Sequence, residues 1–194
     1  MGKTGYKESY LGLCHGTDQE TASLILRDGF QIRGDSSSWC GKGVYFYNIK
    51  RKAYWAAARK CNEIKIKEGK RVKPEVVFAE LEDVPVSEIL DLRSYDDLCD
   101  FEEFFRNDRT YKILIKGKEK DPEHIISMRS LLIAYYAEKT NKKLVIGEFK
   151  QREQPKYAHA IEFAEQMNMI FGTETIFCVK NIEIIKKVRR GQTQ

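Results

Sequence analysis

The chain has 194 residues, of which 42% are hydrophobic and 32% are charged, and its formal net charge is +5. This length and composition indicate one soluble globular domain over residues 1–194 rather than two. No apolar run approaches the roughly 20 residues that span a bilayer, and the first ten residues lack the apolar core of a signal peptide. We therefore expect a cytoplasmic protein with no membrane partner.

The first expected elements alternate between strand and helix. Residues 10–14 form a short apolar run that predicts a strand. The tetrapeptide Thr17-Asp18-Gln19-Glu20 is typical of a helix start, in which Thr17 caps the free amides and Glu20 reaches back to it. This helix is expected to end at Gly29, a residue type that favours the C-terminal cap. Residues 34–42 are rich in turn formers and predict a loop.

The remaining elements follow from the spacing of apolar residues. A periodicity close to 3.6 predicts helices over 52–67, 94–105, from 121 onward and over 157–168. The third of these would bury a stripe made of Ile125, Met128, Leu132 and Tyr135. Alternating or continuous β-prone runs predict strands over 44–47, 74–84, 89–92, 143–149 and 174–180. Residues 182–188 form another strand or a terminal extension, and residues 112–116 a further strand or an irregular segment.

This order of elements favours an α+β fold with split antiparallel β-sheets flanked by helices, because strands and helices do not alternate as regular βαβ units. Gly41-Lys42-Gly43 is rich in glycine but precedes a strand. A dinucleotide-binding or P-loop motif needs the opposite order, with a helix after the glycines.

The cysteine content and the charge limit the kinds of site that this chain is expected to hold. The five cysteines have irregular spacing and no CxxC pair, so we expect reduced thiols, no disulfide framework and no metal site. The mildly basic charge permits an anionic partner such as nucleic acid, but 29 acidic residues are mixed with the basic ones. The basic run at residues 186–190 is the best candidate for a surface that contacts an anionic substrate, although such runs are usually solvated.

Three blocks of residues together resemble a known family. His15-Gly16-Thr17, then Gly41-Lys42-Gly43-Val44-Tyr45-Phe46, then Glu174 at the start of a late strand, are similar to the His-Tyr-Glu signature of ADP-ribosyltransferases of the diphtheria-toxin and poly(ADP-ribose) polymerase class. The resemblance covers residues 11–59 closely and 174–182 loosely. It implies an ADP-ribosyltransferase-like fold and NAD as substrate, with no metal.

The resemblance also implies roles for the first block. His15 would hydrogen-bond the adenosine ribose, whereas its alternative role is that of a core histidine satisfied by backbone. Gly16 would offer its backbone to the nicotinamide amide, where a side chain would obstruct close approach. Thr17 would either contact NAD or cap the helix, and the cap is slightly favoured.

Tyr45 would stack on the nicotinamide ring, and Trp55 on the following helix would supply a second face, with Tyr54 as its neighbour. The alternative for Tyr45 is a strand aromatic packed in the core. Lys52 stands where the family has a small hydroxyl residue, which removes one expected contact to the amide. Glu174 would bind the 2′-hydroxyl of the nicotinamide ribose and offset oxocarbenium charge, or else be an exposed glutamate at the start of a strand.

The activity implied is mono-ADP-ribosyl transfer from NAD to a macromolecular acceptor, either nucleic acid (RNA included) or protein. Small free-standing members of this kind are often bacterial or phage-related toxins, which implies an antitoxin partner and a role in antiviral defence. Gly172 stands two positions before Glu174, where arginine-modifying toxins carry Glu or Gln, so arginine is not the expected acceptor. The alternatives are an NAD glycohydrolase, in which water is the acceptor, and a catalytically silent ADP-ribose- or RNA-binding module.

Overall fold

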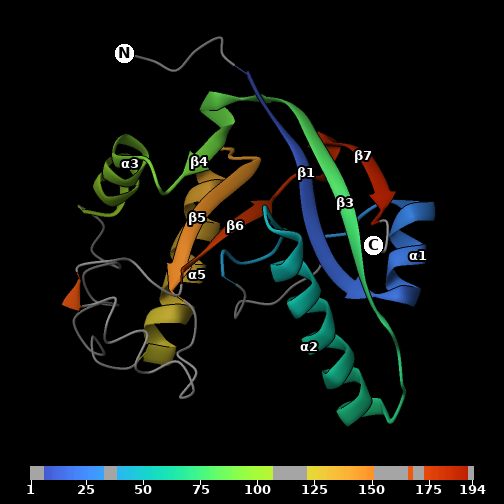
Figure 1. Ribbon diagram of the computed structural model, residues 1–194. Helices are drawn as coiled ribbons and strands as arrows, with labels where there is room; N and C mark the ends of the chain where they lie inside the picture. Colours follow the sequence, from blue (N-terminus) through green and yellow to red (C-terminus); the bar gives the residue numbers. More distant parts are fainter. Residues whose placement is uncertain (1–6, 33–38, 107–121, 151–165, 168–172, 192–194) are drawn as a thin grey trace.

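The computed structural model describes residues 7–32, 39–106, 122–150, 166–167 and 173–191. Its strands form a seven-stranded sheet in the order β4-β5-β6-β2-β1-β3-β7 (Figure 1). β4 and β5 are parallel, and the other neighbouring pairs are antiparallel. The α+β class is therefore confirmed. The described strands form one sheet rather than two split sheets, because β6 pairs with both β5 and β2.

Most element boundaries follow the sequence patterns closely. The strands are β1 (Lys7–Asp18), β2 (Val44–Tyr47), β3 (Pro74–Pro85), β4 (Ile89–Asp91), β5 (Leu144–Lys150), β6 (Thr173–Val179) and β7 (Ile185–Arg190). The α-helices are α1 (Gln19–Asp28), α2 (Lys50–Glu68), α3 (Tyr95–Arg106) and α5 (Pro122–Lys139), and two 3-10 turns cover Val86–Glu88 and Ile182–Ile184. The segment expected at 112–116 lies outside the described residues, as does the helix at 157–168 apart from residues 166 and 167.

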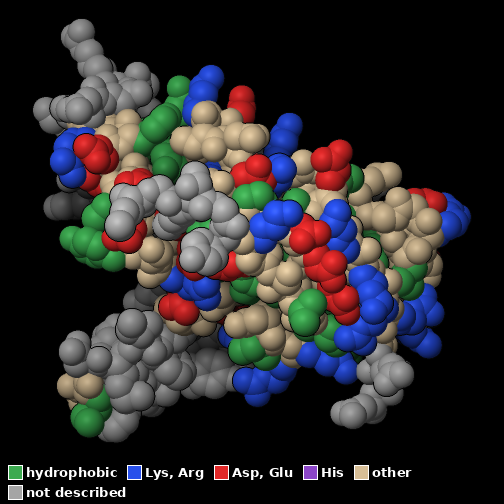
Figure 2. Space-filling view, turned by 90° about the horizontal axis from the view of Figure 1, so that it is seen from above, with side chains coloured by type: hydrophobic (Ala, Val, Ile, Leu, Met, Phe, Trp, Pro, Cys, Tyr) green, Lys and Arg blue, Asp and Glu red, His purple; other side chains and the backbone are tan. Residues whose placement is uncertain are grey.

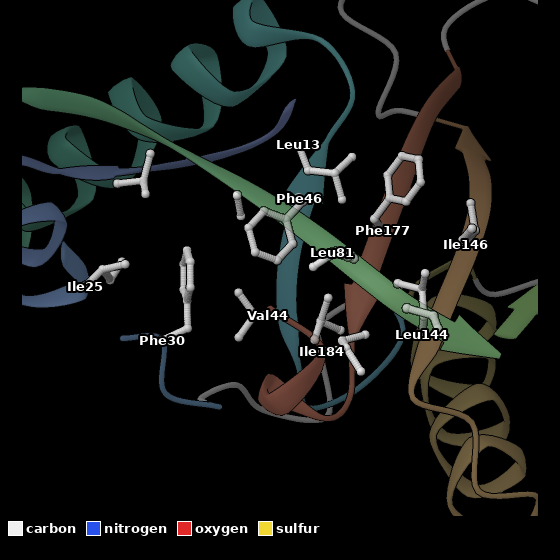
Figure 3. Close-up of a cluster of buried hydrophobic side chains, with 14 of the residues drawn as sticks. Leu13, Ile25, Phe30, Val44, Phe46, Leu81, Leu144, Ile146, Phe177 and Ile184 are labelled. Atoms are coloured by element: carbon white, nitrogen blue, oxygen red, sulfur yellow. The ribbon is translucent and has the colours of Figure 1, made fainter. Parts of the chain in front are cut away.

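The two faces of the sheet carry separate apolar clusters because successive strand side chains point to opposite faces. On β2, Val44 and Phe46 belong to the larger cluster, whereas Tyr45 packs against a second cluster on the side of α5. Figure 3 shows the larger cluster, with Ile25 and Phe30 at one end and Leu144 at the other.

Helix α2 packs against β1 and β3 through small side chains. Ala53 and Ala57 are completely buried, and Cys61 continues the same stripe one turn later. Small residues let the helix backbone approach the sheet closely, so the longer side chains of α2 remain at the surface. No described helix has the length and apolarity to cross a bilayer.

The prediction of mostly buried thiols is confirmed, since Cys14, Cys40, Cys61 and Cys178 are buried and Cys99 is exposed. The stripe predicted for α5 is only partly buried: Ile125 and Tyr135 are 49% and 44% exposed, whereas Leu132 packs against the second cluster. The buried face of α5 is instead formed by Ser130, Ile133, Tyr136 and Ala137.

Candidate active site

His15 lies on β1, and its ring packs with the larger apolar cluster. The ring centroid is 5.2 Å from that of Phe30 and 5.8 Å from that of Phe46, both in edge-on contact. His15 Nδ1 donates a hydrogen bond to the backbone oxygen of Tyr45 over 2.8 Å, because a carbonyl can only accept. Burial lowers the pKa of His15, so the imidazole is neutral at pH 7. This geometry is that of a core histidine satisfied by backbone.

Gly16 lies directly under α2. A Cβ at this position would be only 1.8 Å from the backbone oxygen of Ala53. The close approach that requires glycine here is therefore made by the helix backbone, and no ligand is needed to explain the residue.

The expectation that Thr17 caps α1 is wrong, because Asp18 is the N-cap. Asp18 Oδ1 accepts from the backbone N–H of Thr21 over 2.8 Å. β1 continues through Asp18, so Thr17 is still part of the strand when the helix begins at Gln19. The buried hydroxyl of Thr17 accepts from Lys60 Nζ over 2.8 Å, and Lys60 also pairs with Asp18 over 2.9 Å. This group joins the end of β1 to α2.

Asp18→Ala is expected to lower the free energy of unfolding at pH 7 by about 1–2 kcal/mol through loss of the cap and the ion pair. Burial alone would raise the pKa of Asp18, but hydrogen bonds from Thr21 and Lys60 hold it well below the usual range. A depressed carboxyl pKa stabilises the fold above the unfolded value of about 3.9, and this contribution fades on acidification below it. Urea denaturation at pH 7 and pH 3 should therefore show a smaller difference between wild type and variant at the lower pH.

Asp28→Ala is the matched control at the other end of α1. Among the described residues Asp28 pairs with exposed Arg27 alone, so its loss should change stability much less than the loss of Asp18 does. Equal losses in the two variants would show that Asp18 has no capping role.

Glu174 is buried, with 6% of its surface exposed, at the second position of β6. Lys52 Nζ of α2 lies 2.6 Å from Glu174 Oε1, so the residue that marks the departure from the family signature is the ion-pair partner of this carboxylate. Burial, together with the charge of Glu174, raises the pKa of Tyr47 to about 12. Tyr47 and Lys52 come from the consecutive elements β2 and α2, whereas Glu174 comes from β6, 122 positions after Lys52.

Beside this ion pair is a cavity of about 190 Å³. Its walls combine aromatic rings with groups of both charges, contributed by β2, α2, β6 and the segment before β2. The lining residues are Trp39, Tyr47, Trp55, Ala56, Arg59, Lys60, Glu63 and Glu174. The structure thus brings Trp55 and Glu174 together, as the sequence interpretation requires, whereas His15, Gly16, Thr17 and Tyr45 do not line this cavity.

Tyr45 points toward the cluster beneath α5. Its hydroxyl donates to the backbone oxygen of Gly41 and accepts from the N–H of Cys40 over 3.0 Å, and burial raises its pKa. Tyr47, two residues later on the same face of β2, lines the cavity instead. The strand period offered a signal for Tyr47, since residues i and i+2 share a face, but it does not say which of the two tyrosines meets the cavity.

Among the described residues, no three His, Cys, Asp or Glu side chains gather closely enough to hold a metal ion. No family model matches the chain, and no curated protein or solved structure is significantly similar to it.

Proposed function

We propose that this cavity binds the nicotinamide end of NAD and that the protein is a mono-ADP-ribosyltransferase. The observation that carries the proposal is Glu174, a buried carboxylate at a cavity walled by aromatic rings. Breaking the bond between nicotinamide and ribose develops positive charge on the ribose. A fixed carboxylate in a water-poor site stabilises such charge far better than it would in water.

The aromatic walls suit the leaving group. Nicotinamide in NAD is a flat cation, and the faces of Trp and Tyr attract such cations. Trp55 keeps the role expected from the sequence, and Tyr47 takes the one expected of Tyr45. At about 190 Å³ the cavity is smaller than the roughly 300–1,000 Å³ of sites that enclose a whole drug-sized ligand. It would therefore hold the nicotinamide end, and Arg59, whose pair with Glu63 lies at the surface, would be the wall cation that turns to the diphosphate.

Lys52 supplies the positive charge that balances Glu174 in the free protein. Its side chain is 34% exposed, so it can turn toward solvent when a substrate enters. The developing charge on the ribose would then replace the lysine as the partner of the carboxylate. Catalysis in this scheme needs no proton transfer to the leaving group, because nicotinamide leaves as a neutral molecule.

The test is to incubate the purified protein with NAD labelled in the adenosine part and to measure nicotinamide release by chromatography. RNA, DNA and protein are supplied in separate reactions. Label on a macromolecule identifies transfer, whereas release with free ADP-ribose identifies an NAD glycohydrolase, the second enzyme hypothesis. Absence of release in every reaction would overturn both and leave the silent binding module. If the protein does release nicotinamide, the toxin role is tested by expressing it in growing cells. Expression should stop growth, and an antitoxin partner should restore it.

A further inference from the structure

We propose that residues 50–73, which comprise α2 and the segment that follows it, form a binding surface for single-stranded nucleic acid. This stretch holds ten lysines and arginines against two glutamates, a net charge of +8. The whole protein carries +5, so the other 170 residues together carry −3. The positive charge of the protein is therefore concentrated in one helix and its extension.

Much of this charge is both exposed and uncompensated. Within the described part of the chain, Arg59 pairs with Glu63 and Lys70 with Glu20. Five exposed cations form no ion pair with any other described residue, namely Arg51, Lys65, Lys67, Arg71 and Lys73. The last turns of α2 extend beyond the end of β1, which leaves them open to a large partner (Figure 1).

The far end of α2 carries two cations beside a hollow. The helix ends at Gly69, whose φ of 68° turns the chain back beside the last turns. Lys65 and Arg71 thereby line a common hollow of about 280 Å³ together with Asn62. Two cations and an amide around an open hollow suit a phosphate group, which accepts hydrogen bonds from each of them.

The near end of the same helix carries exposed aromatic rings. Tyr54 and Trp55 are 53% and 44% exposed, and Trp55 also lines the candidate active site. Lys65 is ten positions after Trp55, about 15 Å along the axis at the helical rise of 1.5 Å per residue. A basic track that leads to aromatic rings is how proteins hold single strands, because the rings stack on unpaired bases that a duplex would conceal.

Other anionic partners fit this surface less well. A membrane-binding helix presents a continuous apolar stripe on its outer side, but the apolar stripe of α2 is buried against the sheet. An acidic protein would satisfy the cations but leave no role for the exposed ring of Tyr54, which does not line the candidate active site. Figure 2 shows a face of the protein on which blue and red side chains lie next to one another.

The basic run at residues 186–190 was expected from the sequence to contact an anionic substrate, but several of its side chains contact other residues of the protein. Arg189 lies 4.9 Å from the ring centroid of Phe78, and Arg190 donates to Ser23 Oγ over 3.1 Å. Lys187 is 3.8 Å from Glu80. These side chains belong to β7, an edge strand, where charge also discourages pairing with other chains.

The binding surface adds to the proposed function, because it identifies single-stranded nucleic acid as the acceptor of ADP-ribose. The role as acceptor rests on the proposed cleavage of NAD at Glu174. Binding itself is measured without NAD. If the unmodified protein releases nicotinamide but does not bind single strands, the surface alone is overturned. If it binds single strands but releases no nicotinamide, the enzyme alone is overturned.

The experiment measures fluorescence polarisation of labelled single-stranded RNA, single-stranded DNA and the matching duplexes with the full chain. Between about 50 and 200 mM salt, log affinity should fall linearly with log salt concentration. Lys65→Glu/Arg71→Glu should weaken binding at least tenfold and make the salt slope shallower by about two. Lys186→Glu/Lys187→Glu, which makes the same change of charge on β7, should leave affinity within about twofold, since it removes no phosphate contact.

Trp55→Ala tests the contribution of the aromatic rings. It should weaken binding of single strands about tenfold and leave the weaker duplex binding unchanged. Stronger binding of RNA or of DNA identifies which nucleic acid is the acceptor. Equal losses in the two double variants, preference for duplexes, or stronger binding to vesicles of phosphatidylserine and phosphatidylcholine would each overturn the proposal.

Discussion

Glu174→Gln is expected to lower the rate of nicotinamide release by about two to three orders of magnitude, the usual cost of losing one preorganised group that stabilises transition-state charge. Glutamine keeps the shape of the side chain, and Lys52 is exposed enough to be solvated when its partner is neutral. Because the interaction strengthens only in the transition state, kcat and kcat/KM should fall together while KM changes little. Steady-state rates at several NAD concentrations measure this.

Glu63→Gln is the control in the same cavity. Glu63 lines the cavity but pairs with Arg59 at the surface, where its side chain is 48% exposed. Loss of such a surface pair is worth at most about 1 kcal/mol, or roughly fivefold in rate. Comparable losses in the two variants, or an unchanged rate in Glu174→Gln, would contradict the role given to Glu174.

Gly16→Ala is expected to destabilise the fold by about 3 kcal/mol or more. The new Cβ would be 1.8 Å from the oxygen of Ala53, and it would meet helix backbone rather than the end of a flexible side chain. The clash can be relieved only if α2 moves away from β1, which opens a packed interface. The loss of stability is therefore expected at or above the upper end of the range for substitutions that overfill a core. Urea denaturation with a global two-state fit measures the loss.

Gly69→Ala separates this steric cost from the conformational cost of losing a glycine. Gly69 has φ of 68°, and a Cβ there would meet no other atom within 4 Å. Its replacement should cost only about 1–2 kcal/mol, the penalty of left-handed backbone for an L-residue. A smaller loss for Gly16→Ala than for Gly69→Ala would show that α2 does not pack on β1 at this point.

Elements whose signals are local could be predicted from the sequence. β2 is bounded as expected, because a compact β-prone run follows a turn-rich segment. The buried stripe of α2 follows from the helical spacing of Ala53 and Ala57. Glu174 lies at the second position of the strand that was expected to begin with it, although the sequence left open whether it was buried.

The rest depends on packing between elements that are distant in the chain. Tyr45 and Tyr47 share one face of β2, and only the positions of α2 and α5 decide which tyrosine meets the cavity. In α5, both the predicted stripe and the buried one have helical spacing, and the sheet selects between them. The cap moved from Thr17 to Asp18 because β3 continues to pair with β1 through Asp18, a constraint that the local pattern does not contain.

The position of β6 in the sheet also determines when the candidate active site can form during synthesis of the chain. β6 is the link between the β4-β5 pair and the strands on the other side, and the ion pair at the site joins residues 122 positions apart. Contacts at such separation form late, after the large cost in chain entropy has been met. During synthesis on the ribosome, a chain that has not yet reached residue 179 lacks this link. The proposed enzyme would therefore be inactive as a nascent chain, and cellular NAD would be exposed to it only after β6 has been made.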